Sequence, residues 1–366
     1  MGSPLTHRQF ARILLVKPSS LGDVIHALPV LEGLRQRYPS AHIAWLIATP
    51  FVDLIEGHPA LDEVIPFDRT RFGRLSRSLA VSGEFVRFVR SLRRREFDLG
   101  VDLQGLFRSG FLTWCTRAGV RIGPGDAREV ARVFYTHRYP VESMETHALD
   151  RMWGLAGMLG FDATPKVFRL PIHAVDRNAV RKALRTCGVD PDRDYAVVFP
   201  AARWETKVWP AERFAAVIDR MAAKMNLPSV LAGSAAERSV CESVAARSTS
   251  KPANLAGATT LRQVIALIDA ARLVLTNDSG PMHLADALNR PLVALFGPTN
   301  PVRTGPYHQR DAVVRLDLPC SPCYLRNLRR CPHRHMCLED LTVDHVLGAV
   351  TERLPPTSAS SATELG

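Results

Sequence analysis

The segment RILLVKPSSLGDVIHALPVLEGLRQRY, residues 12–38, decides the fold class of this chain. Its opening run, residues 12–17, has the short apolar composition that is typical of a buried strand. Apolar residues then recur at helical spacing, which predicts a helix over residues 23–38 that Pro29 would kink or whose start it would delay. A buried strand that leads directly into a helix is the building unit of parallel α/β sheets.

The same alternation continues along the chain and restarts after an extended stretch at residues 168–175. Strands are expected at residues 42–48, 62–67, 97–105, 119–124, 195–200, 228–234, 272–278 and 292–297. Helices are expected at residues 51–57, 79–95, 210–225, 237–248, 261–271 and 282–288. Strands that alternate with helices imply parallel sheets covered on both faces.

We therefore expect an α/β protein with two Rossmann-like parallel-sheet domains that face each other across a cleft. The first domain is predicted over residues 1–172 and the second over residues 173–354. The remaining residues, 355–366, have the low-complexity composition of a disordered tail. Ligands of such sheets bind at the carboxyl ends of the strands, so functional residues are expected in the loops that follow the strands.

Composition narrows the classes of function. Lysine and arginine exceed aspartate and glutamate by 47 − 36 = 11, which predicts an anionic partner: nucleic acid, an acidic membrane face or a phosphorylated ligand. Aromatic residues make up only 7% of the chain and are not interleaved with basic residues on one element, which argues against nucleic-acid binding. No apolar run approaches the ~20 residues that span a bilayer, and no signal-peptide core precedes Ile13, so a cytoplasmic location is expected.

The first candidate loop, residues 17–29, joins the first strand to its helix. Gly22 permits a tight turn there, and Ser20 offers a hydroxyl beside the exposed amides of the helix N-terminus. Asp23 follows the carboxyl end of the strand, where a carboxylate could accept a proton from a sugar hydroxyl. The alternative is an aspartate that only stabilises the helix dipole.

Two further loops lie in the second half. Lys207 comes just before a helix expected from Pro210, where a cation and free amides could together hold a diphosphate; an ordinary surface lysine is the alternative. The segment TNDSGPMH, residues 276–283, joins a strand to a helix. A phosphate there would meet unpaired amides, although the segment could also be only a well-formed helix start.

Four motifs in order, KPSSLGDVIHALP, ARWETKVWP, LAGSAAE and TNDSGPMHLADALNRPLVALFGPTNP, resemble glycosyltransferase family 9, the bacterial heptosyltransferases. The resemblance covers roughly residues 12–350 and implies the GT-B fold, with the acceptor on the N-terminal domain and the donor on the C-terminal one. It also implies inverting, metal-independent transfer of heptose from ADP-L-glycero-D-manno-heptose to the lipopolysaccharide inner core, on Kdo or on the first heptose. The enzyme would bind this acceptor at the inner face of the inner membrane.

The resemblance also implies roles for individual residues. Asp23 matches the catalytic base, and Lys207 matches the lysine that neutralises the departing diphosphate. The donor-binding positions are Arg203, Glu237, Asp278, Ser279, Gly280 and His283. The acceptor-binding positions are Ser20, Gly22, Arg69, Arg71, Gln104, Arg108 and Arg128. Ala201 and Ala202 stand where the family often has Ser or Thr, so Arg203 is expected to serve the phosphate electrostatically.

Several alternatives stay open. Another nucleotide sugar or acceptor, an inactive member that only binds nucleotide or lipid, and a nucleic-acid-binding protein are the rival functions, and oligomeric state is unreadable from the sequence. Seven cysteines in a large cytosolic chain do not suggest a disulfide framework. A structural zinc site or reduced structural thiols would each fit the C-terminal group Cys320, Cys323, Cys331 and Cys337.

Overall fold

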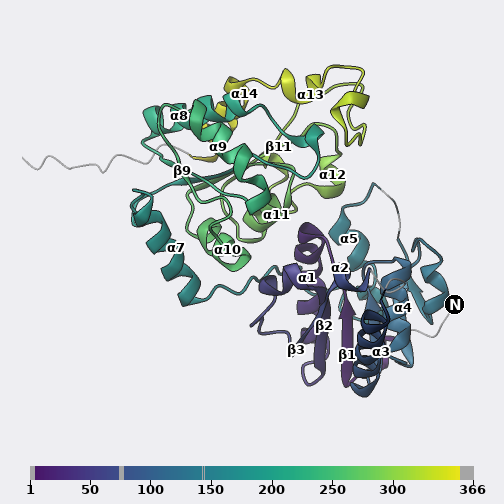
Figure 1. Cartoon of the computed structure of the whole chain (residues 1–366). Helices are drawn as coiled ribbons and strands as arrows, with labels where there is room; N and C mark the ends of the chain where they lie inside the picture. The colour runs from purple at the N-terminus through teal and green to yellow at the C-terminus, as the bar shows by residue number, and fades with distance from the viewer. Residues whose placement is uncertain (1–4, 74–77, 142, 144, 355–366) are drawn as a thin grey trace, which may run out of the picture. The chain divides into compact units, whose positions relative to one another are not determined.

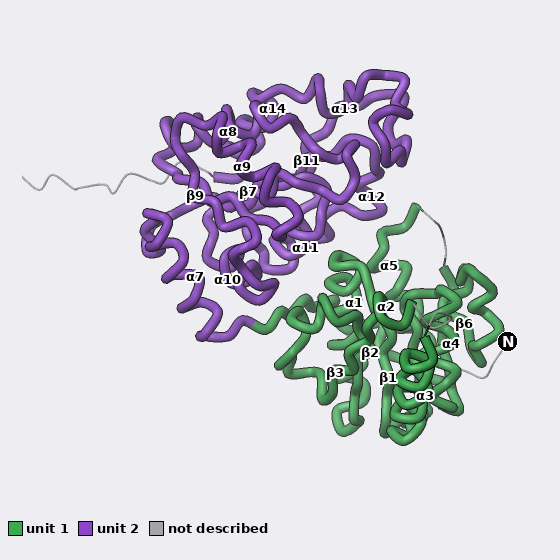
Figure 2. Tube along the Cα trace, viewed as in Figure 1, with its two compact units in different colours: residues 1–171 green, residues 172–366 purple. Residues whose placement is uncertain are grey.

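The computed structural model describes residues 5–73, 78–141, 143 and 145–354, so the disorder predicted for residues 355–366 lies outside the described residues. The chain divides into two compact units, Met1–Pro171 and Ile172–Gly366 (Figure 2). Each unit contains a six-stranded sheet, and the strand pairs in both sheets are parallel. The predicted fold class, α/β with two Rossmann-like parallel sheets, is confirmed.

The sheet of the first unit has the strand order β3-β2-β1-β4-β5-β6, of which Figure 1 labels β3, β2 and β1. Its strands are β1 Arg12–Val16, β2 His42–Ala48, β3 Glu63–Phe67, β4 Leu99–Asp102, β5 Val120–Pro124 and β6 His137–Tyr139. Five of these coincide with predicted strands. The sixth, β6, was not predicted, because three residues of mixed polarity carry too little periodicity to reveal a strand.

Helices of the first unit connect these strands. They are α1 Leu21–Arg37, α2 Arg69–Phe72, α3 Leu79–Arg94, α4 Phe107–Cys115, α5 Ala148–Trp153 and α6 Ala156–Leu159, with 3₁₀ turns η1 Leu5–His7, η2 Thr49–Leu54 and η4 Ala131–Phe134. Helix α1 begins at Leu21 and continues through Pro29, so the expected delay of its start is wrong. Burial of its apolar residues outweighs the backbone hydrogen bond that proline removes. Residues 51–57, expected as a helix, instead contribute to the 3₁₀ turn η2.

The sheet of the second unit has the order β12-β11-β10-β7-β8-β9. Its strands are β7 Ala196–Phe199, β8 Ser229–Leu231, β9 Ala253–Asn254, β10 Leu273–Asn277, β11 Leu292–Leu295 and β12 Val313–Val314. Its helices are α7 Ala174–Thr186, α8 Ala211–Met225, α9 Arg238–Arg247, α10 Leu261–Asp269, α11 Gly280–Ala287, α12 Pro301–Thr304, α13 Met336–Glu339 and α14 Val343–Arg353, with 3₁₀ turns η5 Glu205–Lys207, η6 Ala235–Glu237, η7 Arg310–Ala312 and η8 Leu328–Arg330. The extended stretch expected at 168–175 stops earlier, because α7 already begins at Ala174.

Each sheet is covered by apolar side chains. In the first unit, Leu14 and Val16 of β1 belong to a buried cluster that also contains Leu92 of α3 and Leu112 of α4. In the second unit, the largest buried side chain of the core is Trp209, whose indole N–H donates to the backbone oxygen of Leu341 at 2.9 Å. Among the described residues, no helix is both long and apolar enough to cross a membrane.

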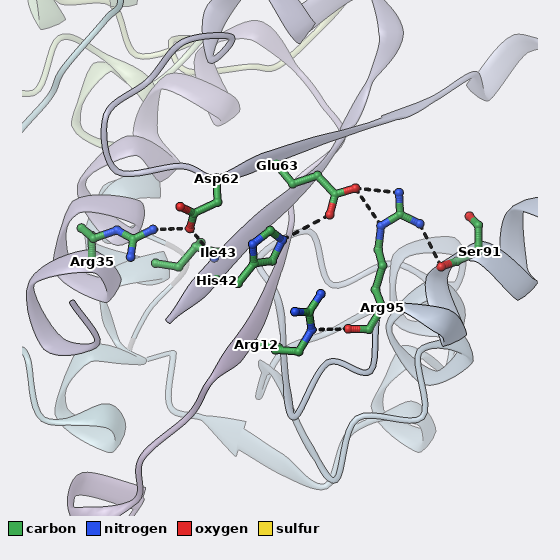
Figure 3. A network of polar contacts seen from close by, with 8 residues as sticks. All are labelled: Arg12, Arg35, His42, Ile43, Asp62, Glu63, Ser91 and Arg95. Carbon is green, nitrogen blue, oxygen red and sulfur yellow. Dashed lines mark hydrogen bonds and ion pairs between the residues drawn. The ribbon is translucent and has the colours of Figure 1, made fainter. Parts of the chain in front are cut away.

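A network of charged side chains closes the amino ends of β1, β2 and β3 (Figure 3). Glu63 accepts hydrogen bonds from Arg95 Nε at 2.8 Å and from Arg95 Nη2 at 2.6 Å, and His42 Nε2 lies 3.3 Å from its other oxygen. Burial tends to raise the pKa of Glu63, but the hydrogen bonds from Arg95 and His42 outweigh it and hold that pKa below its usual value. The network therefore stabilises the end of the sheet opposite the predicted functional loops.

Candidate active site

Asp23 lies in the first turn of α1, directly after β1. Its Oδ2 atom accepts hydrogen bonds from the Ser20 backbone N–H at 2.9 Å and from the Ser20 hydroxyl at 2.7 Å, which is the geometry of a capping box. The contacts expected of an aspartate that stabilises the start of the helix are therefore present. The carboxylate nevertheless keeps 39% of its surface exposed, so the contacts orient it without burying it. Gly22, beside it, is buried.

Lys17 links Asp23 to the neighbouring strand. Its ammonium group lies 3.5 Å from Asp23 Oδ1 and donates a hydrogen bond of 3.1 Å to the backbone oxygen of Leu103, which follows β4. Lys17 is itself buried, and β1 and β4 are paired with Val16 opposite Asp102. The lysine therefore stabilises the Asp23 carboxylate and joins the loops after β1 and β4. Lys17 lies in the first of the four motifs, but its sequence context alone predicts no role for it.

Buried Asp102 shapes the loop that follows β4. Its Oδ1 accepts from the backbone N–H groups of Gln104 and Gly105, and its Oδ2 accepts from the Tyr135 hydroxyl at 2.6 Å. Burial raises the pKa of Asp102 although Tyr135 and Ser109 donate hydrogen bonds to it. Gln104, a predicted acceptor residue, has a buried Oε1 atom with no hydrogen-bond partner among the residues that the structure describes.

The predicted acceptor arginines separate into two groups. The Arg128 backbone N–H donates to Gly105 at 2.9 Å, so this exposed arginine adjoins the Gln104 loop. Arg108 is exposed in the first turn of α4, which begins soon after Gln104. Arg69 and Arg71 instead lie on α2, after the outer strand β3, and Arg71 forms a two-point ion pair with Glu84, at 2.6 Å for both contacts.

In the second unit, Lys207 and Asp278 form an ion pair. The Lys207 ammonium lies 2.5 Å from Asp278 Oδ2, and both side chains are largely buried. Asp278 also accepts a hydrogen bond of 2.5 Å from the Thr299 hydroxyl. The loops that follow β7, β10 and β11 are thus held together at the carboxyl ends of three neighbouring strands.

Asn277 fixes the same arrangement through the backbone. It is fully buried, its amide donates to the Pro200 oxygen at 2.8 Å, and its Oδ1 accepts from the Trp209 N–H at 3.2 Å. Lys207 also lies over the ring of Trp204, 4.5 Å from its centroid, and Arg326 approaches that ring at 4.6 Å. Because these cations gather beside one another, the loop is suited to an anionic ligand.

Helix α11 begins at Gly280, earlier than the predicted start at residue 282. Ser279 is its N-cap residue, and its hydroxyl lies 3.1 Å from that of Thr276. His283 is buried within the first turns of the helix. The exposed amides of such a helix start favour an anion. Of the predicted donor residues of this loop, Asp278, Ser279, Gly280 and His283, Asp278 contacts the ammonium group of Lys207 and the other three lie at or after the start of α11.

The remaining predicted donor residues lie on two other loops of the second unit. Glu237 accepts hydrogen bonds from the Ser234 N–H at 2.7 Å and the Ser234 hydroxyl at 2.8 Å, after β8. This repeats the arrangement of Ser20 and Asp23 in the first unit. Arg203 is exposed in the loop after β7.

The four C-terminal cysteines belong to one region. The Ser321 hydroxyl donates to the Gly297 oxygen at 2.6 Å, and a Cβ atom at Gly297 would meet the Cys337 sulfur at 2.9 Å. Burial and the neighbouring thiols of Cys323, Cys331 and Cys320 raise the pKa of Cys337 to about 11. In the described part of the chain, no group of three His, Cys, Asp or Glu side chains is arranged as ligands of one metal ion, so the zinc site stays a prediction.

Comparison with known proteins agrees with this geometry. A model of glycosyltransferase family 9 (heptosyltransferase) matches residues 85–331. Lipopolysaccharide heptosyltransferase 1 of Pseudomonas aeruginosa is 34% identical, over 85% of this chain and 86% of the relative. Lipopolysaccharide heptosyltransferase 2 of Escherichia coli is 30% identical, over 83% of this chain and 88% of the relative.

Solved structures give the same result. A glycosyltransferase family 9 protein from Veillonella parvula superposes with a TM-score of 0.81 at 25% identity, covering 96% of this chain and 99% of that one. The E. coli heptosyltransferase WaaC with ADP superposes with a TM-score of 0.74 at 27% identity, covering 93% and 99%. With the family model matching well over half of its length, the chain belongs to glycosyltransferase family 9, the heptosyltransferase family.

Proposed function

We propose that this enzyme transfers a heptosyl group from ADP-L-glycero-D-manno-heptose to the inner core of lipopolysaccharide, with inversion at the anomeric carbon. Membership of the family supports the reaction class, relatives named lipopolysaccharide heptosyltransferase support the transferred sugar and the acceptor, and the E. coli heptosyltransferase WaaC solved with ADP supports the nucleotide. The first unit binds the acceptor and the second unit binds the nucleotide sugar. The acceptor is a lipid, so the enzyme works at the inner face of the inner membrane, from the cytoplasmic side.

In the proposed mechanism, Asp23 accepts the proton of the acceptor hydroxyl as its oxygen attacks the anomeric carbon. Ser20 and Lys17 keep the carboxylate in place. The bond between the anomeric carbon and the diphosphate oxygen breaks, and negative charge grows on the departing ADP. Lys207 and the N-terminus of α11 stabilise that charge, which is the main electrostatic requirement of the transition state.

Further residues bind the two substrates in this proposal. Glu237 contacts the nucleoside, His283 contacts the ribose or a phosphate, and Arg203 adds positive charge near the diphosphate. Gln104, Arg108 and Arg128 bind the anionic acceptor, because arginine forms paired hydrogen bonds with carboxylates and phosphates. A lysine and a helix N-terminus serve the diphosphate, so the mechanism needs no metal ion.

The ion pair between Lys207 and Asp278 carries the donor-site assignment. It places a desolvated ammonium group beside the start of α11, and such a cation is more strongly attracted to a diphosphate than an exposed one. The 34% identity to the heptosyltransferase 1 of Pseudomonas aeruginosa supports Kdo as the acceptor sugar, whereas the E. coli heptosyltransferases 1 and 2, at 29% and 30%, do not separate the two acceptors.

The test is transfer from ADP-heptose to purified Kdo₂-lipid A and, separately, to its monoheptosylated form. We expect turnover on the unheptosylated acceptor that Asp23→Ala abolishes. Turnover only on the monoheptosylated acceptor would reassign the enzyme to the second heptose. Failure to bind ADP-heptose in calorimetry would overturn the donor assignment.

A further inference from the structure

Helix α4 and the turn η4 expose a group of large apolar side chains on the first unit. We call this group the aromatic patch and define it as Phe107, Phe111, Trp114, Val133 and Phe134. Phe107, Trp114 and Val133 have exposed fractions of 51%, 46% and 67%. Such exposure of bulky apolar groups on one short stretch of surface marks an interaction site more often than chance scatter does.

The four aromatic rings of the patch contact one another, and Val133 precedes Phe134 in the chain. The rings of Phe107 and Phe111 are stacked with centroids 6.2 Å apart, and Phe134 lies 5.3 Å from Phe107 and 6.2 Å from Trp114. Helix α3 packs beside α4, with Phe85 stacked on Phe111 at 6.4 Å. The packed rings hold one another in fixed orientations, so the patch is a preformed surface.

Arginines surround this surface. Residues 103–125 include Arg108, Arg117 and Arg121 but no aspartate or glutamate. A depression of about 270 Å³ beside Trp114 is lined by that ring together with Arg93, Arg117 and Arg121. The backbone fixes two of these arginines, since Arg93 Nε donates to the Cys115 oxygen at 3.2 Å and Arg121 Nε donates to the Phe134 oxygen at 2.8 Å.

We propose that the aromatic patch and these arginines dock the enzyme on the surface of an anionic phospholipid bilayer. Tryptophan and phenylalanine favour the boundary between headgroups and acyl chains, and arginine beside them binds lipid phosphates. The charge argues against a second copy of the chain as the occupant, because the same arginines would face each other. One acidic residue, Glu129, contacts this region, where it accepts a hydrogen bond from the Phe107 N–H at 3.2 Å.

The position of the patch deepens the proposed function, on which this step rests. Helix α4 begins soon after Gln104, and Glu129 joins its first turn to the segment that carries Arg128. Docking of α4 therefore holds the proposed acceptor residues of the first unit close to the headgroup layer. A lipid-linked sugar would then reach them without leaving the bilayer.

The binding test uses the full chain and sedimentation with vesicles of phosphatidylethanolamine and phosphatidylglycerol, or of phosphatidylcholine alone. We expect binding to the anionic vesicles that salt weakens. Arg117→Glu should weaken it about fivefold or more, because one basic residue near an anionic surface changes binding by about that factor. Val133→Asp should also weaken it, because it puts a carboxylate in place of an apolar side chain against the anionic surface. Val175→Asp is the matched control: Val175 is 66% exposed on α7 of the second unit.

A second readout separates this proposal from the proposed function. The patch variants should lower transfer to Kdo₂-lipid A in anionic vesicles and leave transfer to a deacylated, soluble form of that acceptor at the wild-type rate. Equal vesicle binding by Val133→Asp and Val175→Asp would overturn the docking surface, as would a self-association that Val133→Asp abolishes. If the wild type transfers heptose to neither acceptor, the proposed function fails while vesicle sedimentation still decides the docking surface.

Discussion

The ammonium group of Lys207 lies 2.5 Å from Asp278 Oδ2, so the loops after β7 and β10 are joined by an ion pair. Thr299 donates to the same oxygen from the loop after β11. In the proposed mechanism, an incoming diphosphate shares Lys207 with Asp278, whose carboxylate holds the ammonium group in position. Asp278 thus positions Lys207, and Lys207 supplies the positive charge.

Replacing Lys207 tests this role. Lys207→Met should lower kcat by about 100-fold or more, because it removes a cation that acts on charge developing in the transition state. Lys207→Arg should recover part of the loss. The measurement is steady-state heptosyl transfer together with ADP binding by calorimetry. Lys224→Met, at an exposed lysine of α8, is the matched control, and equal kcat values for the two methionine variants would exclude the role.

Asp23 has two candidate roles that a conservative variant separates. Asp23→Asn keeps an oxygen that accepts from Ser20 but cannot take a proton, so kcat should fall by about 100-fold or more. The melting temperature should fall only in part, because the ion pair with Lys17 is lost while the contacts with Ser20 are kept. Ser20→Ala removes the capping partner and should cost about 1 kcal/mol of stability with a smaller loss of kcat. Wild-type turnover by Asp23→Asn would leave Asp23 a helix cap alone.

The sequence predicted much of the fold because five strands of the first sheet and the loops after β1, β7 and β10 have strong local patterns. The apolar run of β1, for example, ends at Lys17 and leads directly into the motif that contains Asp23. Strand β6, with three residues, and helix α7, which follows directly on the extended segment around Pro171, lacked such a signal. Their conformations depend on packing against distant parts of the chain.

The sequence predicted site residues only where a single loop contains a recognisable motif. Lys17 donates a hydrogen bond to the backbone oxygen of Leu103, 86 residues away in the sequence. Asn277 donates one to the backbone oxygen of Pro200, 77 residues away. Thr299 lies in the last of the four motifs, but its contact with Asp278 depends on the pairing of β10 with β11. Pairings of this kind follow from sheet register, which local periodicity does not specify.

Glu237 is expected to bind the nucleoside. Glu237→Gln keeps an oxygen for the Ser234 hydrogen bonds but removes the negative charge that would hold ribose hydroxyls, so the Kd for ADP should rise about tenfold. Fluorescence or calorimetric titration with ADP gives this Kd directly. Glu242→Gln, at an exposed position on α9, controls for the change in net charge and should bind ADP like the wild type.

The Glu63–Arg95 pair predicts how stability depends on pH. The pKa of Glu63 is lower in the folded protein than its usual value, so its contribution is present above the unfolded pKa of about 4.3 and is lost as the pH falls through the lower folded value. Glu63→Gln should therefore cost about 1 kcal/mol of unfolding free energy at pH 7 and progressively less below pH ~4. Urea unfolding of the wild type and of Glu63→Gln, at pH 7 and again below pH ~4, measures this difference in unfolding free energy. Asp192→Asn, which removes an exposed ion pair with Arg181, is the control and should change stability by less at pH 7, since solvent screens that pair. A cost for Glu63→Gln that stayed constant with pH would contradict the stabilising role of the Glu63 carboxylate.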